Sequence, residues 1–310
     1  MSDISSRSKR RGEIRAMFRS NVDGRLLKDK VMIGVITSSA IISVIPLFWI
    51  LAQLVVGGAP ALNWEFLTGE PGAVGAGQIN IGPAVQGTII IIALSSLIGI
   101  PVGMLTGVYL SEVGRGRMVG LIRFYLDVFM QVPSIVLGLF AFLAIVLILG
   151  HFSVWAGALA LSLIMFPIVA RSTEEQLKMV PWTYREAGAA LGLRKVTITT
   201  RIVLAAAKKR MLTGILLSVS RIGGESAPLI MTILGSSQFF RGFDAPMDAL
   251  PLRIWRFSLL PYEEARLAGW GAALVLVVII LLIHVGVRYW FQGKGSKGLI
   301  HLNRREKKKQ

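Results

Sequence analysis

From Val128 to Ala170 the sequence reads VFMQVPSIVL GLFAFLAIVL ILGHFSVWAG ALALSLIMFP IVA, and these 43 residues contain no Asp, Glu, Lys or Arg. A membrane-spanning helix needs only about 20 predominantly apolar residues, so this run is too long for a single crossing. The polar stretch 150–153, Gly-His-Phe-Ser, is the expected turn between two spans. The sequence therefore predicts an all-α membrane protein built around this pair of helices.

Four further apolar runs lie on either side of this pair, at residues 31–56, 84–110, 211–234 and 267–290. Together with the divided central run they predict six membrane spans. A charged tail of 30 residues precedes the first run, and this run is too long for a signal-peptide core. We therefore expect no cleaved leader.

The composition supports a membrane protein and argues against other classes. Hydrophobic residues make up 54% of the chain and charged residues only 16%, which is more apolar material than a soluble domain needs. The net charge of +17 would suit a nucleic-acid binder, but the basic residues lie between apolar runs, so no nucleic acid is expected as a partner. The chain has no cysteine, no His/Glu metal signature and no nucleophile elbow, so neither a metal nor a catalytic residue is expected.

The positions of Lys and Arg predict the orientation of the spans. The segments 1–30, 111–123, 172–210 and 291–310 carry nine, three, eight and seven basic residues. The alternating segments are 57–83, which has none, and 235–266, where four are balanced by four acidic residues. Because basic loops stay in the cytoplasm, both termini are expected there. The expected domains are a basic tail (1–30), a transmembrane domain in contact with lipid (31–291) and a second basic tail (292–310).

Glycine and proline residues predict how the spans pack. Gly99, Gly103 and Gly107 recur at every fourth position and form a smooth strip on one face of the second span. Such strips let helix backbones approach closely in lipid. Four prolines lie within or at the ends of spans and predict kinks: Pro46, Pro101, Pro133 and Pro167.

The loop 172–210 contains the sequence Arg-Glu-Ala-Gly-Ala-Ala-Leu-Gly at residues 185–192. Ala187 to Leu191 are expected to form a short helix, with Gly192 as its C-cap. A second stretch, 196–204, leads into the basic residues 208–210. A short helix held between two basic arms can be pushed by a partner protein, although an ordinary amphipathic connector would have a similar pattern.

This loop resembles the coupling-loop signature of ABC importer permeases, which is Glu-Ala-Ala, three residues, Gly, nine residues and Ile-x-Leu-Pro. Glu186, Ala187 and Gly192 match the signature, whereas Gly188 and Ala205 replace its second Ala and its Pro. The resemblance implies the six-helix fold of type I importers. It also implies that Glu186 to Gly192 form the coupling helix, which fits a groove on an ABC ATPase.

Further motifs are similar to phosphate ABC permeases of the PstA type, and they lie at residues 81–88, 132–138, 171–175, 221–229 and 250–254. The sister subunit of the PstC type usually has Gly-Glu-Thr-Met-Ala where this chain has Gly-Glu-Ser-Ala-Pro. The resemblance covers about two-thirds of the chain and implies phosphate import across the bacterial cytoplasmic (inner) membrane. It implies three partners: a PstC-like second permease in a heterodimer, a PstB-like ATPase dimer and an external PstS-like phosphate-binding protein.

Two charges lie within the fifth apolar run. An arginine at the centre of a span costs about 2.5–3.5 kcal/mol, so Arg221 needs a partner. Glu225 lies four residues later, one helical turn away on the same face, and is expected to pair with it. The pair could be structural, or Arg221 could bind an anion through its rigid fork. In the second case Glu225 would neutralise Arg221 between substrates and accept the proton of phosphate.

Two further residues are candidates for the substrate path. Arg171 lies at the inner end of the fourth span, with Glu175 four residues later. An arginine there is also what the positive-inside bias produces, but the resemblance favours the substrate path. Asp127, six residues before Pro133, is the other candidate. His284 in the sixth span is expected to be a helix-contact residue.

The chain lacks a Gly-x-x-x-x-Gly-Lys-Ser/Thr phosphate loop, so we expect neither ATP hydrolysis by this chain nor a bound cofactor. Energy would arrive through the coupling loop from a separate ATPase subunit. Three functions remain open at this point: a phosphate permease, a permease for another oxyanion such as phosphonate, sulfate or molybdate, and a membrane scaffold for phosphate signalling.

Overall fold

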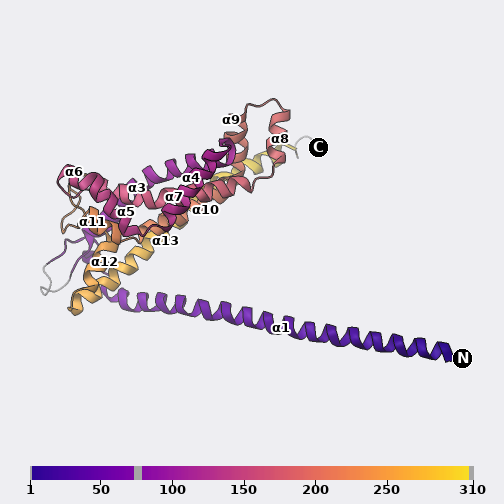
Figure 1. Cartoon of the computed structure of the whole chain (residues 1–310). Coiled ribbons are helices and arrows are strands. Elements are labelled where there is room, and N and C mark those ends of the chain that lie inside the picture. Colours follow the sequence, from indigo (N-terminus) through magenta and orange to yellow (C-terminus); the bar gives the residue numbers. More distant parts are fainter. Residues whose placement is uncertain (1, 73–78, 307–310) are drawn as a thin grey trace. The chain divides into compact units, whose positions relative to one another are not determined.

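The computed structural model describes residues 2–72 and 79–306. All the named secondary-structure elements in these ranges are helical. The chain divides into two compact units, residues 1–56 and 57–310. The first unit is formed by α1 (Ser2–Gly58), the helix labelled at the N-terminal end of the chain in Figure 1. The stretch Lys28–Ala61, which begins in α1 and ends with the 3-10 turn that follows it, is long and apolar enough to cross a membrane, as expected for the first span.

The second unit contains four long helices: α3 (Gly82–Val108), α7 (Val154–Lys178), α10 (Leu204–Gly223) and α13 (Glu263–Glu306). The shorter helices are α2 (Trp64–Thr68), α4 (Arg117–Gln131), α5 (Ser134–Ala141), α6 (Leu147–Leu149), α8 (Thr183–Ala190), α9 (Lys195–Thr197), α11 (Ala227–Thr232) and α12 (Leu250–Ser258). A 3-10 turn, η1 (Ala59–Ala61), and three π-helical segments, η2 (Tyr109–Val113), η3 (Phe142–Val146) and η4 (Ile198–Val203), complete it. In Figure 1, α8 and α9 lie at one end of this unit and α6, α11 and α12 at the other.

Among the described residues, four helical segments are long and apolar enough to span a membrane: Lys28–Ala61, Gly82–Val113, Val154–Lys178 and Glu263–Tyr289. A fifth is possible if α4 and the stretch Ser134–Leu149, which runs from α5 to α6, together form one broken span. The four segments agree with the expected first, second, fourth and sixth spans. The total of six stays a prediction.

The expected turn within the apolar run 128–170 is present. Gly150 ends α6 with a left-handed backbone (φ 77°), a conformation that glycine adopts at little cost. Ser153 then caps α7, because its side-chain oxygen accepts a hydrogen bond from the backbone N–H of Ala156 at 3.3 Å. The central run is therefore divided at 150–153, as its polar residues indicated.

The region of the expected fifth span, residues 211–234, is not one continuous helix, so the expectation of a single helix there is wrong. α10 ends at Gly223, and α11 begins only at Ala227. Proline explains the break, because the ring of Pro228 in a continuous helix would clash with the carbonyl of Gly224. Pro133 acts in the same way between α4 and α5, which meet at a bend of 102°. The kink expected at Pro133 is thus a complete break, whereas Pro46, Pro101 and Pro167 lie inside continuous helices.

The two interrupted helix pairs, α4–α5 and α10–α11, pack against each other through α5 and α11. Gly138 of α5 lies so close to α11 that a Cβ atom there would be 2.5 Å from the Cα atom of Pro228. Real Cβ atoms do not approach a backbone atom this closely, so position 138 requires glycine. The two breaks are therefore brought to the same region of the bundle.

The glycine strip of α3 faces α7. A Cβ atom on Gly103 would lie 2.7 Å from the carbonyl oxygen of Phe166 and 2.7 Å from the Cβ atom of Val169. On Gly107 it would lie 2.6 Å from the carbonyl oxygen of Ala170. The strip therefore serves packing within this chain, where it holds the two backbones in direct contact.

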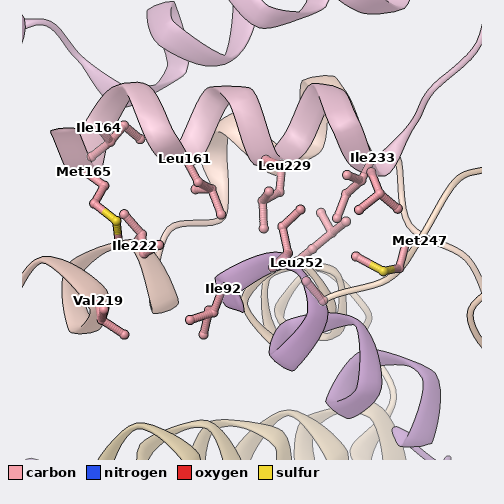
Figure 2. Packing of buried hydrophobic residues seen from close by; sticks show 14 of the residues in the cluster. Ile92, Leu161, Ile164, Met165, Val219, Ile222, Leu229, Ile233, Met247 and Leu252 are labelled. Atoms are coloured by element: carbon pink, nitrogen blue, oxygen red, sulfur yellow. The ribbon is translucent and has the colours of Figure 1, made fainter. Parts of the chain in front are cut away.

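The main apolar core joins the same helices. Figure 2 shows Leu161, Ile164 and Met165 of α7 near side chains from several other elements. These are Ile92 of α3, Val219 and Ile222 of α10, Leu229 of α11, Ile233 beside its end, Met247 of the following loop and Leu252 of α12. In this core, α10 before the break and α11 after it both pack against α7.

Replacing Gly103 by Ala should destabilise the protein by about 1–3 kcal/mol, the usual cost of overpacking a tight interface. The control is Gly120→Ala on α4, where a Cβ atom would meet nothing within 4 Å. This change should be neutral or slightly stabilising, because alanine favours helix. Thermal unfolding of the purified protein in detergent measures both effects. Equal shifts for the two variants would contradict the close contact of α3 and α7.

Candidate functional site

The short helix expected in the loop 172–210 is α8, and it ends in a regular capping motif. The N–H of Leu193 donates to the carbonyl of Gly188 at 3.1 Å, and the N–H of Gly192 donates to that of Ala189 at 2.9 Å. Gly192 has a φ of 72°. These two bonds and the left-handed glycine define a Schellman motif, so the expected role of Gly192 at the helix end is confirmed.

Glycine at position 188 has a packing reason. Gly188 is buried, and a Cβ atom on it would lie 2.9 Å from Ile198 and 3.2 Å from Ile202. The departure from the coupling-loop signature at this position therefore lets α8 lie directly against η4. Glu186 and Ala187, by contrast, are exposed.

A second side of α8 is held by Arg185. Its Nε and Nη2 atoms donate to the two carboxylate oxygens of Glu112, at 3.1 Å and 2.6 Å. Its Nη1 atom donates to the carbonyl of Val180 at 2.9 Å, and Nη2 also donates to that of Leu177 at 3.0 Å. Only 12% of the Arg185 side chain and 5% of the Glu112 side chain are exposed. Neither residue was expected to have this role.

Arg171 belongs to a cluster of charges at the end of α7 that lies near α8. It pairs with Glu175 at 3.5 Å, as the spacing indicated, and also with Glu174 at 3.5 Å. Glu174 is completely buried and accepts from the Nε atom of Arg123 at 2.7 Å and from the Nζ atom of Lys178 at 2.6 Å. One buried carboxylate thus binds three cations, and this hub ties α4 to α7.

Arg221 lies in the last turn of α10, beside the break that follows Gly223. It lines a cavity of about 80 Å³ together with Ser134, the first residue of α5. Ile164 and Ile168, near the middle of α7, line the same cavity. Arg221 is therefore level with the middle of α7, but it lies in the last turn of its own helix and not at the centre of a continuous one.

The expected pair between Arg221 and Glu225 is absent. Glu225 lies outside α10, so the one-turn spacing of a continuous helix does not apply to it. Within the described part of the chain neither side chain makes an ion pair. Arg221 is exposed and Glu225 is partly buried. Asp127, partly buried on α4, likewise has no ion pair there.

At the opposite end of the unit, Asp248 and Arg253 form a buried pair. The Nε atom of Arg253 donates to Asp248 at 2.6 Å, and its Nη2 atom donates to the carbonyl of Ser236 at 3.1 Å. Burial raises the pKa of Asp248 above the ordinary value of an aspartate, although the charge of Arg253 acts to lower it. The pair fixes the start of α12 and is separate from the charges described above.

His284 behaves as a helix-contact residue, as expected. Its Nε2 atom lies 3.0 Å from the hydroxyl oxygen of Ser220, which joins α13 to α10. Its Nδ1 atom lies 2.9 Å from the carbonyl of Ile280 in the preceding turn. The contact places α13 beside the last turns of α10.

A model of one protein family, described as the binding-protein-dependent transport system inner membrane component, matches residues 99–293. The chain is also similar to proteins named phosphate transport system permease protein PstA. It is 38% identical to that of Pasteurella multocida, over 88% of this chain and 97% of the relative. It is 36% identical to the probable PstA of Methanocaldococcus jannaschii, over 86% of this chain and 94% of the relative.

The fold is similar to that of a solved structure, inward-facing MetNI methionine ABC transporter. The TM-score is 0.52 at 17% sequence identity, over 66% of this chain and 90% of that chain. At this identity the similarity concerns the fold alone.

Replacing Glu174 by Gln should destabilise the protein by about 1–3 kcal/mol, because an amide cannot accept from three cations at once. The matched control is Glu175→Gln, whose side chain is 60% exposed and whose loss should cost less than about 1 kcal/mol. Thermal unfolding in detergent compares the two variants. An equally small effect in both would show that the hub contributes little.

Proposed function

Because the chain belongs to the family of binding-protein-dependent transport system inner membrane components, we propose that it is a permease subunit of an ABC importer that moves inorganic phosphate. Its fold is that of the type I ABC importer permeases, as expected, and its apolar helices are those of a multi-pass membrane protein. The observation that carries the proposal is the position of Arg221 at a helix break level with the middle of α7, where it opens on a cavity.

Arg221 and the cavity beside it suit an oxyanion. Its charge is permanent, and its planar fork can bind two oxygens of phosphate at once. The start of α5 lies at the same cavity, and no side chain caps that helix end. Free N–H groups and the helix dipole at such an end attract negative charge. Breaks in membrane helices are tolerated where they line a cavity of this kind.

Glu225, Arg171 and Asp127 are proposed to act along the same path. Glu225 lies in the break beside Arg221, where it would limit how tightly the anion is held and accept a proton from phosphate. Arg171 would meet the anion at the end of the path near α8, within the positively charged hub around Glu174. Asp127, on α4 between Arg123 of this hub and the break after Gln131, would lie along the same path.

α8 is proposed to be the coupling helix. Its exposed Glu186 and Ala187 would contact an ABC ATPase dimer, and its closely packed Gly188 and capped end at Gly192 would keep it rigid under load. ATP would be used only by that ATPase, so the chain itself would need no cofactor. The end of the bundle that carries α8 would then face the cytoplasm, together with both termini.

The remaining partners follow from the same proposal. A second, PstC-like permease would complete the pore as a heterodimer, and a PstS-like binding protein would deliver phosphate to the opposite end of the bundle. The surrounding phase would be the lipid of the bacterial inner membrane.

Reconstitution in proteoliposomes with the ATPase, the second permease and the binding protein tests the substrate. We expect phosphate-loaded binding protein to stimulate ATP hydrolysis and phosphate uptake. Sulfate, molybdate and phosphonate, each offered with its own binding protein, should do neither. If one of these other anions stimulated both activities and phosphate did not, that anion would be the substrate. An assembled complex that takes up none of the four anions would point to a signalling scaffold.

Replacing Arg221 by Gln should lower phosphate uptake by at least about a hundredfold, because a buried anion loses its charged partner. Arg221→Lys should restore little, since lysine lacks the fork. The control is Lys209→Gln, an exposed basic residue earlier on α10. Uptake and the amount of assembled complex are measured together, and normal uptake by the Arg221→Gln complex would remove Arg221 from the substrate path.

A further inference from the structure

Arg185 is the point at which α8 is joined to two other helices. Its guanidinium group uses four hydrogen bonds: two to Glu112 in η2, which continues α3, one to Leu177 in the last turns of α7, and one to Val180 in the turn that follows. Its Cζ atom also lies 5.4 Å from the ring centre of Trp182. A single side chain therefore connects α8 with the ends of α3 and α7.

The geometry of this connection is unusually restrictive. A bidentate arginine–carboxylate pair fixes the orientation of both groups as well as their distance. Both side chains are nearly buried, so removing one partner leaves a buried charge without compensation, which is far more costly than losing an exposed pair. Lysine could not replace Arg185, because a single ammonium group cannot reach acceptors spread over three segments.

The two helices that Arg185 joins to α8, α3 and α7, also pack against each other. The glycine strip places the backbone of α3 against α7, with Gly107 facing Ala170 and Thr173 close to the ends of both helices. A force on α8 would therefore act on α3 and α7 as one body. Apolar side chains remain exposed on α8 and at its end, since Tyr184 is 50% exposed and Leu191, the residue after the helix, is 77% exposed.

We propose that the Arg185–Glu112 pair is the mechanical link through which movement of α8 reaches the spans. The inference rests on the proposed function in one respect, namely that a partner ATPase moves α8. Arg185 and Glu112 are positioning residues in this scheme, and neither of them contacts the substrate. The link makes α8 travel with α3 and α7.

A double-mutant cycle tests the link in the reconstituted complex. Arg185→Gln and Glu112→Gln should each lower phosphate uptake per ATP hydrolysed by about tenfold, while basal ATP hydrolysis and assembly are retained. The double variant should be no worse than either single variant, because both changes break the same contact. Arg185→Lys should behave like Arg185→Gln, and the control Lys209→Gln should match the parent.

A purely structural role gives a different result. Loss of structure would lower the amount of complex, uptake and basal ATP hydrolysis together, and would leave the ratio of uptake to hydrolysis unchanged. An unchanged ratio, or additive losses in the double variant, would overturn the proposal.

A distance measurement tests the link without reference to the substrate. The chain has no native cysteine, so spin labels can be placed at Thr183→Cys on α8 and Leu105→Cys on α3, both exposed positions. In the parent complex the label distance should be narrow and equal with and without ATP, and Arg185→Gln should broaden it or make it depend on ATP. An unaltered distribution in Arg185→Gln would overturn the link. The expected distances in a complex that fails to take up phosphate would keep the link and reject phosphate as the substrate.

Discussion

Inside a bilayer every backbone N–H and C=O group must find its partner within the protein, and this constraint organises the structure. Continuous helices such as α3 and α7 satisfy it by themselves. The two proline-associated breaks, at Pro133 and before Pro228, do not, and residues beside both of them line one cavity, where such breaks are tolerated. Gly138 of α5 packs against Pro228 of α11, and Arg221 lines the cavity at the start of α5.

Much of this arrangement could be predicted from the sequence, because it depends on local patterns. Long apolar runs located four of the candidate spans, the polar turn at 150–153 divided the longest run, and Gly192 marked the end of α8. The glycine period on α3 indicated a closely packed face, which proved to be the face against α7. In each case a few neighbouring residues determine the outcome.

Contacts between distant segments could not be predicted in this way. Glu112 and Arg185 are 73 positions apart, and neither stands out among the many charges outside the apolar runs. Part of the Glu174 hub could have been predicted, since Arg171 and Lys178 lie three and four residues from Glu174 on one helix. The pair expected between Arg221 and Glu225 was wrong because it assumed a continuous helix. Pro228 indicates a break there, since its ring would clash with the carbonyl of Gly224 in a continuous helix.

The interface between α3 and α7 is made mainly from backbone and short side chains, so it has few rotamers to lose and no lipid within it. The outer face of α3 carries large exposed side chains, among them Leu97 and Leu105, that can adapt to acyl chains of different length. A change in bilayer composition would therefore be absorbed at the outside of the bundle. The spacing of this helix pair should stay the same in thin and thick membranes.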